Sequence, residues 1–144
     1  MYSGPSYLSL DAKGRIAIPT RYREDLGVNL VLTADPKGCL LLFPEAHWQP
    51  FEERVGALPN LNRRIDAMQS LWLGYRTDCE VDAAGRLVLT PELRDYAKLD
   101  RKIHMIGKGD RFELWSERRW QDVVELAQTS WRDDPPAELA GLSV

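Results

Sequence analysis

The sequence predicts an α+β protein built from two half-domains that are related by a pseudo-twofold axis and close on each other. Three observations support this prediction. A nine-residue segment occurs twice, 71 residues apart. Around the turn in that segment, apolar residues fall on alternate positions, which is the period of a β-strand. Longer stretches carry apolar residues at three- and four-residue intervals, which is the period of an amphipathic helix.

The repeat is the most informative of these features. Segment 10–18, L-D-A-K-G-R-I-A-I, aligns with segment 81–89, V-D-A-A-G-R-L-V-L, with four identical residues. Segments 42–48 and 114–120 align 72 residues apart, so a one-residue gap reconciles the two offsets. Two copies are too few for a solenoid. They favour two fused half-domains, residues 1–76 and 77–131, followed by a flexible tail over 132–144.

Each half is expected to run as strand, D-x-x-G-R turn, strand, short helix, two strands and a longer helix. In the first copy, Thr20 is expected to cap the short helix and Gly27 to end it. Strands are then expected over 29–33 and 39–43, around a turn at 35–38.

The second copy repeats these devices. Thr90 is expected to cap the short helix, with Pro91 at its first position. Strands are expected over 103–106 and 112–115, around the glycine-rich turn 107–110. In each half, therefore, the same order of elements follows the repeated turn.

Three amphipathic segments are predicted as helices. One begins after Asn62 and stops at Gly74, and one begins after Ser116. A third includes Trp48, Phe51 and Val55, and it is started or interrupted at Pro50. We expect the aromatic stripes of these helices in the core or in subunit contacts.

Composition excludes several classes of protein. The chain has 144 residues, of which 44% are hydrophobic and 28% charged, as in ordinary globular proteins. Two cysteines and two histidines, at spacings that match no ligand template, predict no metal site and no cofactor. No run of about 18 apolar residues predicts a membrane span, and the N-terminus lacks a signal-peptide pattern. We therefore expect a cytoplasmic protein without a small-molecule substrate.

The charge is unevenly distributed along the chain. The net charge of −3 argues against a chain-wide nucleic-acid surface. Residues 13–23, however, hold four cations and no anion: Lys13, Arg15, Arg21 and Arg23. Because the local field decides where a polyanion binds, a small basic patch is expected in the first half.

The D-x-x-G-R turn has two interpretations. In the structural one, Gly14 and Gly85 supply a backbone with positive φ, while Asp11 and Asp82 accept hydrogen bonds from the turn. The arginines at 15 and 86 then only pair with those carboxylates. In the functional one, each arginine leaves the turn toward solvent. A β-ribbon can enter the major groove, where arginine binds guanine or phosphate through two hydrogen bonds.

The order of motifs resembles the MraZ family of bacterial transcriptional regulators. The resemblance rests on the doubled turn, the M-Y-x-G start, L-D-A-K-G-R-I-A-I-P-x-R-Y-R and the central L-W-L-G, from residue 1 to about 128. It implies an AbrB-like swapped-hairpin fold, with both halves forming one pseudo-symmetric β-barrel flanked by helices. It also implies a ring of protomers on the nucleoid, which binds direct repeats in promoter DNA upstream of the cell-division and cell-wall gene cluster.

The family's motif falls on Asp11 with Arg15 and on Asp82 with Arg86. Two departures distinguish this chain: Ser3 stands where family members often carry a basic residue, and Ala84 stands where the first turn has Lys13. Both departures favour the first turn as the DNA contact. Arg86 is retained as a second DNA-binding candidate.

Other functions are weighed against this one. An enzyme is not expected, because no nucleophile elbow, P-loop, dinucleotide fingerprint or metal-binding helix motif is present. An antitoxin-like interaction module remains an alternative, although its usual form has one half-domain and a long tail. A ring that assembles without touching DNA is the third alternative, supported by the negative net charge.

Overall fold

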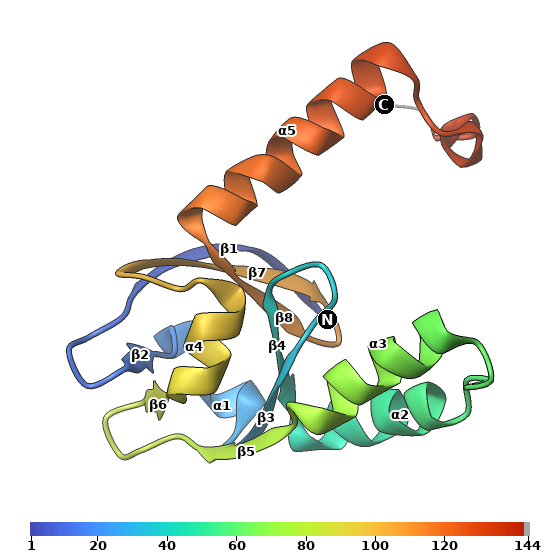
Figure 1. Ribbon diagram of the computed structural model, residues 1–144. Coiled ribbons are helices and arrows are strands. Elements are labelled where there is room, and N and C mark those ends of the chain that lie inside the picture. The colour runs from blue at the N-terminus through green and yellow to red at the C-terminus, as the bar shows by residue number, and fades with distance from the viewer. Residues whose placement is uncertain (143–144) are drawn as a thin grey trace.

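The computed structural model describes residues 1–142 and confirms the α+β class (Figure 1). Its strands are β1 Tyr2–Ser9, β2 Arg15–Ala17, β3 Asn29–Ala34, β4 Leu40–Pro44, β5 Thr77–Glu80, β6 Arg86–Val88, β7 Lys102–Gly109 and β8 Phe112–Ser116. Its helices are α1 Thr20–Leu26, α2 Glu45–Gly56, α3 Arg63–Gly74, α4 Pro91–Ala97 and α5 Glu117–Asp133, followed by the 3₁₀ helix η1 Ala137–Leu139. The predicted order of elements is present in both halves.

The helices begin as predicted, with one exception at a cap and one at a proline. Thr90, Asn62 and Ser116 each accept backbone hydrogen bonds at the starts of α4, α3 and α5. Thr20 does not cap α1: Pro19 stands at the N-cap, and Thr20 is the first helical residue. The order Pro-Thr, instead of Thr-Pro as in the second copy, moves the hydroxyl one residue past the capping position. The proline at position 50 neither starts nor interrupts α2, which runs through it.

Strands are exchanged between the two halves. The six-stranded sheet has the order β1-β7-β8-β4-β3-β5, and β2 pairs with β6 in a separate two-stranded ribbon. Thus β1 of the first half pairs with β7 of the second, and β5 of the second pairs with β3 of the first. These pairings are symmetric about a pseudo-twofold axis that passes between β4 and β8 and between β2 and β6. The axis relates the β1–β7 pair to the β5–β3 pair and the β7–β8 pair to the β3–β4 pair.

The expected closed barrel is not formed. In the described part of the chain, β1 and β5 are the outer strands of the sheet, and no strand pairing joins them. The reason is local: the D-x-x-G-R turn directs the chain away after β1 and β5, and the three-residue strands that follow pair only with each other. Single backbone hydrogen bonds, such as Leu10 N to Arg101 O at 2.9 Å, extend the pairing of the outer strands by one residue before each turn.

The central strands β3, β4 and β8 are buried on both faces of the sheet. On one face, Leu32 and Leu114 pack with the inner side of the ribbon and with α1 and α4 in the main core. On the other face, Val31 and Phe43 pack against Trp48 and the rest of the buried stripe of α2. This second layer supports the sheet from behind, so the ribbon is held rigidly over the main core.

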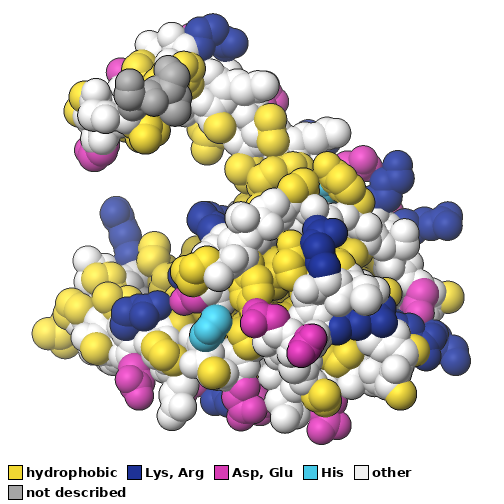
Figure 2. Space-filling view, turned by 180° about the vertical axis from the view of Figure 1, so that it is seen from behind, with side chains coloured by type: hydrophobic (Ala, Val, Ile, Leu, Met, Phe, Trp, Pro, Cys, Tyr) yellow, Lys and Arg dark blue, Asp and Glu magenta, His cyan; other side chains and the backbone are white. Residues whose placement is uncertain are grey.

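Helix α5 leaves this body as an arm (Figures 1 and 2). None of its 17 described residues is buried. The stretch expected as a tail starts in its last turn, contains η1, and ends with residues 143 and 144, which lie outside the described residues. No helix within residues 1–142 has the length and apolar character needed to cross a bilayer.

Candidate nucleic-acid interface

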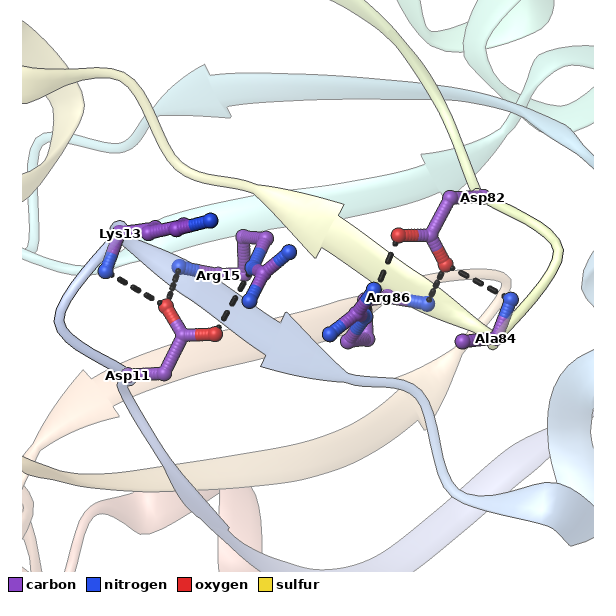
Figure 3. Close-up of polar contacts among 6 residues, drawn as sticks. All are labelled: Asp11, Lys13, Arg15, Asp82, Ala84 and Arg86. Carbon is purple, nitrogen blue, oxygen red and sulfur yellow. Dashed lines mark hydrogen bonds and ion pairs between the residues drawn. The ribbon is translucent and has the colours of Figure 1, made fainter.

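The first D-x-x-G-R turn is organised by one carboxylate (Figure 3). Asp11 Oδ1 accepts hydrogen bonds from the backbone amides of Lys13 and Arg15, both at 2.9 Å. Its Oδ2 accepts a bond from the Nε atom of Arg15 at 2.8 Å. Gly14 closes the turn with a φ of 76°, which a side chain would resist. The same aspartate therefore fixes both the backbone of the turn and the direction of the arginine.

The second turn has the same design. Asp82 Oδ1 accepts from the amides of Ala84 and Arg86 at 2.9 and 2.8 Å, and Oδ2 accepts from Arg86 Nε at 3.2 Å. Gly85 has a φ of 77°. The two turns differ mainly in the exposed residue at the tip, which is lysine in the first and alanine in the second.

The ribbon places both arginines on one exposed face. Ile16 of β2 pairs with Leu87 of β6, and both side chains are buried in the core. Their neighbours point the other way because side chains alternate along a strand. Arg15 and Arg86 therefore share the outer face, diagonally across the ribbon, and Figure 3 shows both side chains between the two aspartates.

Each arginine makes the ion pair that the structural interpretation expects. This ion pair with aspartate uses only Nε. Within residues 1–142, the terminal amino groups of Arg15 and Arg86 make no hydrogen bond to protein. The side chains are 23% and 40% exposed, respectively. The aspartate thus orients each guanidinium and leaves its two terminal nitrogens available for a bidentate contact.

Two further arginines cross between the halves. Arg23 of α1 lies against Gly85 of the second turn, and Arg94 of α4 lies against Gly14 of the first. Each donates through Nε to a backbone carbonyl of its own half, at 2.7 Å for Arg23 and 3.1 Å for Arg94. The structure therefore brings Arg23 to the second turn, away from the first-copy patch in which the sequence placed it.

Arg21 lies apart from the turns. Its Nη2 donates to Ser6 Oγ of β1 at 2.6 Å, and its guanidinium stacks on the ring of Tyr22. Arg94 is a cation that the sequence interpretation missed. The repeat contained the signal for it, since Arg94 follows Arg23 by the same 71 residues that separate the two turns.

The turn carboxylates should remain ionised down to low pH. Their hydrogen bonds from the backbone amides of Arg15 and Arg86 lower the pKa values of Asp11 and Asp82. A lowered pKa stabilises the fold above the unfolded value of about 3.9, and this contribution is lost as pH falls through the folded value. We expect NMR titration midpoints below those of the same carboxyls in denaturant. Equal midpoints would contradict this geometry.

Comparison with known proteins agrees with the duplicated design. A family model described as "MraZ protein, putative antitoxin-like" matches residues 1–69 and again residues 73–140. The chain belongs to the MraZ family. The match falls twice, once on each copy of the turn and the elements that follow it.

Curated members of the MraZ family align along the whole chain. A protein of Nitrosomonas europaea named transcriptional regulator MraZ is 40% identical over the full length of both chains. One of Thioalkalivibrio sulfidiphilus with the same name is 44% identical, again over both full lengths. One of Histophilus somni is 44% identical over 90% of this chain and 88% of its own.

Among residues 1–142, no group of three His, Cys, Asp or Glu side chains is placed to hold a metal ion.

Proposed function

We propose that this chain is a sequence-specific DNA-binding transcriptional regulator that places the outer face of the β2–β6 ribbon in the major groove. The major groove admits a two-stranded ribbon, and a guanidinium can bind guanine O6 and N7 together. The observation that carries the proposal is the pair of arginines, each fixed through Nε and, among residues 1–142, without a hydrogen-bond partner at either terminal nitrogen. Two such groups on one rigid face match two base edges or phosphates.

The relatives support this role. They are named as transcriptional regulators. From the family resemblance of the sequence motifs, we propose as targets the direct repeats in the promoter of the cell-division and cell-wall gene cluster, and as location the cytoplasm and nucleoid. Arg23 and Arg94 add positive charge beside the turns, so the ribbon carries a local field that the net charge of −3 conceals.

The first turn is the stronger contact in this proposal. With Arg23 and Arg94 exchanged between the halves, the charge difference between the turns rests on Lys13 against Ala84. A lysine at the tip of a turn neutralises one phosphate, which adds roughly −0.9 to the slope of log K against log salt. The first turn therefore makes one more contact to the DNA phosphate backbone than the second turn does. The arginines of both turns can contact bases.

Assembly into a head-to-tail ring completes the proposal. The helices α2 and α5 occupy equivalent places, but α3 packs on α2 through Phe51 and Trp72, with ring centroids 5.9 Å apart. The main contacts of α5 are with β7 and β8 at its first turns, and its apolar stripe continues along the arm beyond them. An uncovered apolar stripe indicates an interface, and a closed ring avoids filaments.

The experiment is a series of operators with one to four direct repeats. Several protomers of one ring would occupy successive major grooves on one face of DNA, about 10–10.5 bp apart. Each bound turn raises the effective concentration of the next, so affinity should rise by at least tenfold per added repeat up to the geometric limit. Fluorescence anisotropy across salt concentrations should show a steeper slope with each repeat.

A half-turn insertion is the matched control for this series. Inserting about 5 bp between repeats turns the second site to the opposite face of DNA, so the gain in affinity should disappear. The multivalent mechanism is wrong if one repeat binds as tightly as four. A ring that binds no operator would favour the assembly-only alternative, and a tightly co-purifying small protein would favour the antitoxin-like one.

A further inference from the structure

Two surface grooves share one pair of positions related by the pseudo-twofold axis at a strand start, Lys102 and Asn29, and another at a helix start, Glu117 and Glu45. One lies where β7 begins and α5 begins, and the other where β3 begins and α2 begins. Their cavity volumes are similar, about 550 and 570 Å³. Strand pairing defines the equivalence: Lys102 pairs with Ser9, and Asn29 pairs with Glu80 in the other half.

The groove beside β7 is basic. We define the basic groove by its four exposed cations, Lys98, Arg101, Lys102 and Arg118. It also contains two carboxylates, Asp100 and Glu117, so cations are in excess. Within residues 1–142, the first three cations make no ion pair, and Arg118 forms an exposed ion pair with Asp122 one turn along α5, at 3.7 Å. These charges therefore do not serve the fold of this chain.

The groove beside β3 is acidic. We define the acidic groove by Glu45, Asp78 and Glu80, all exposed, with Arg76 as its single cation. Arg76 is shared between Asp78 at 3.2 Å and Glu52 at 3.0 Å. In the described part of the chain, Glu45 and Glu80 have no cationic partner. Negative charge thus predominates here.

The charges break the pseudo-symmetry in opposite directions. The equivalents of Arg101 and Lys102 are Val28 and Asn29, which are neutral. The equivalents of Asp78 and Glu80 are neutral too, Tyr7 and Ser9 on β1. Each groove therefore owes its excess charge to residues whose equivalents in the other half are neutral.

We propose that the basic groove of one protomer docks against the acidic groove of the next copy of this chain, so that charge sets the head-to-tail direction of assembly. Two identical grooves would also permit head-to-head pairing, which closes a dimer and stops growth. Opposite charges suppress that pairing, because like charges facing each other are unfavourable. The interface rests on the head-to-tail assembly proposed above and assigns the surfaces that form it.

The test is a reciprocal charge reversal in the full chain without DNA. Arg101→Glu/Lys102→Glu makes both grooves acidic, and Asp78→Lys/Glu80→Lys makes both basic. All four positions are exposed, so thermal unfolding should remain close to wild type. By light scattering, each variant alone should dissociate at a concentration roughly tenfold or more above wild type, because like charges then meet at every contact.

Recombining the charges is the decisive control. An equimolar mixture of the two variants should restore assembly, and the chain with all four substitutions should assemble as wild type does. The mixture still tests the interface if that fourfold variant does not fold. The interface is wrong if both single variants keep the wild-type mass or if the mixture does not recover it.

Two further outcomes separate this interface from the proposed function. A monomeric wild-type chain contradicts the proposed ring and the interface together. A wild-type ring that is indifferent to charge reversal contradicts the interface alone. If Arg101→Glu/Lys102→Glu keeps its mass but loses affinity for a one-repeat operator, the basic groove contacts DNA phosphate, and the proposal is wrong.

Discussion

Replacing Arg15 by alanine should abolish specific operator binding while leaving the fold intact. Loss of one bidentate base contact costs about 1–3 kcal/mol. The loss recurs in every protomer of a ring that spans several repeats, so on a four-repeat operator we expect at least a thousandfold weaker binding. Arg15 is on the outer face of the ribbon, opposite to the buried Ile16, so its removal leaves no cavity.

Three variants make the result specific. Arg15→Lys keeps the charge but not the planar pair of donors, so it should recover non-specific binding and little of the specific affinity. Arg132→Ala removes an equal charge near the end of α5 and should bind as wild type. Arg86→Ala should weaken binding less than Arg15→Ala, because its turn has no lysine. Wild-type affinity of Arg15→Ala for the operator would mean that the turn is only structural.

Local signals predicted the elements well because their causes are local. Apolar alternation, the caps Thr90 and Ser116, and the glycine at 85 each act within a few residues. The one failed cap shows the same sensitivity, since exchanging Pro-Thr for Thr-Pro moves a hydroxyl by one position. Most of the element order therefore follows from short-range chemistry and the repeat.

Short-range sequence signals do not predict the contacts between the two halves. Arg23 is close in sequence to Arg15, yet it lies on the turn of the other half because β2 and β6 pair across the axis. Counting charges along the chain therefore overestimates the positive charge beside the first turn, and it overlooks Arg94. The failure of the barrel to close has a similar origin: strand length decides it, and three-residue strands were not distinguishable from longer ones by apolar period alone.

Replacing the apolar stripe on α5 by polar residues should dissociate the proposed ring into single protomers. The stripe is the second-half equivalent of the buried stripe of α2. Its residues Trp120, Val123 and Ala127 follow Trp48, Phe51 and Val55 by 72 residues each. In α5 it extends to Val124 and Trp131, which are 38% and 52% exposed. Such side chains are stabilised only if a neighbouring protomer covers them, as α3 covers α2 within the chain.

Val124→Gln/Trp131→Gln should therefore weaken assembly strongly. Burying each side chain contributes about 1.5–3 kcal/mol, so losing both should raise the dissociation constant of the contact by roughly two to four orders of magnitude. Light scattering at micromolar concentration should report the mass of one chain. The unfolding temperature of the protomer should not fall, because neither residue is buried in it.

Leu126→Gln is the matched control for this prediction. Leu126 is more exposed, at 67%, but at about 100° per residue it lies roughly 140–160° around α5 from Val124 and Trp131. Its replacement should leave the mass unchanged. The assembled and dissociated forms should bind a single operator repeat alike, since each ribbon is complete in one chain, and they should differ only on several repeats. If the stripe variant stays assembled, another surface joins the protomers and the role assigned to α5 is wrong.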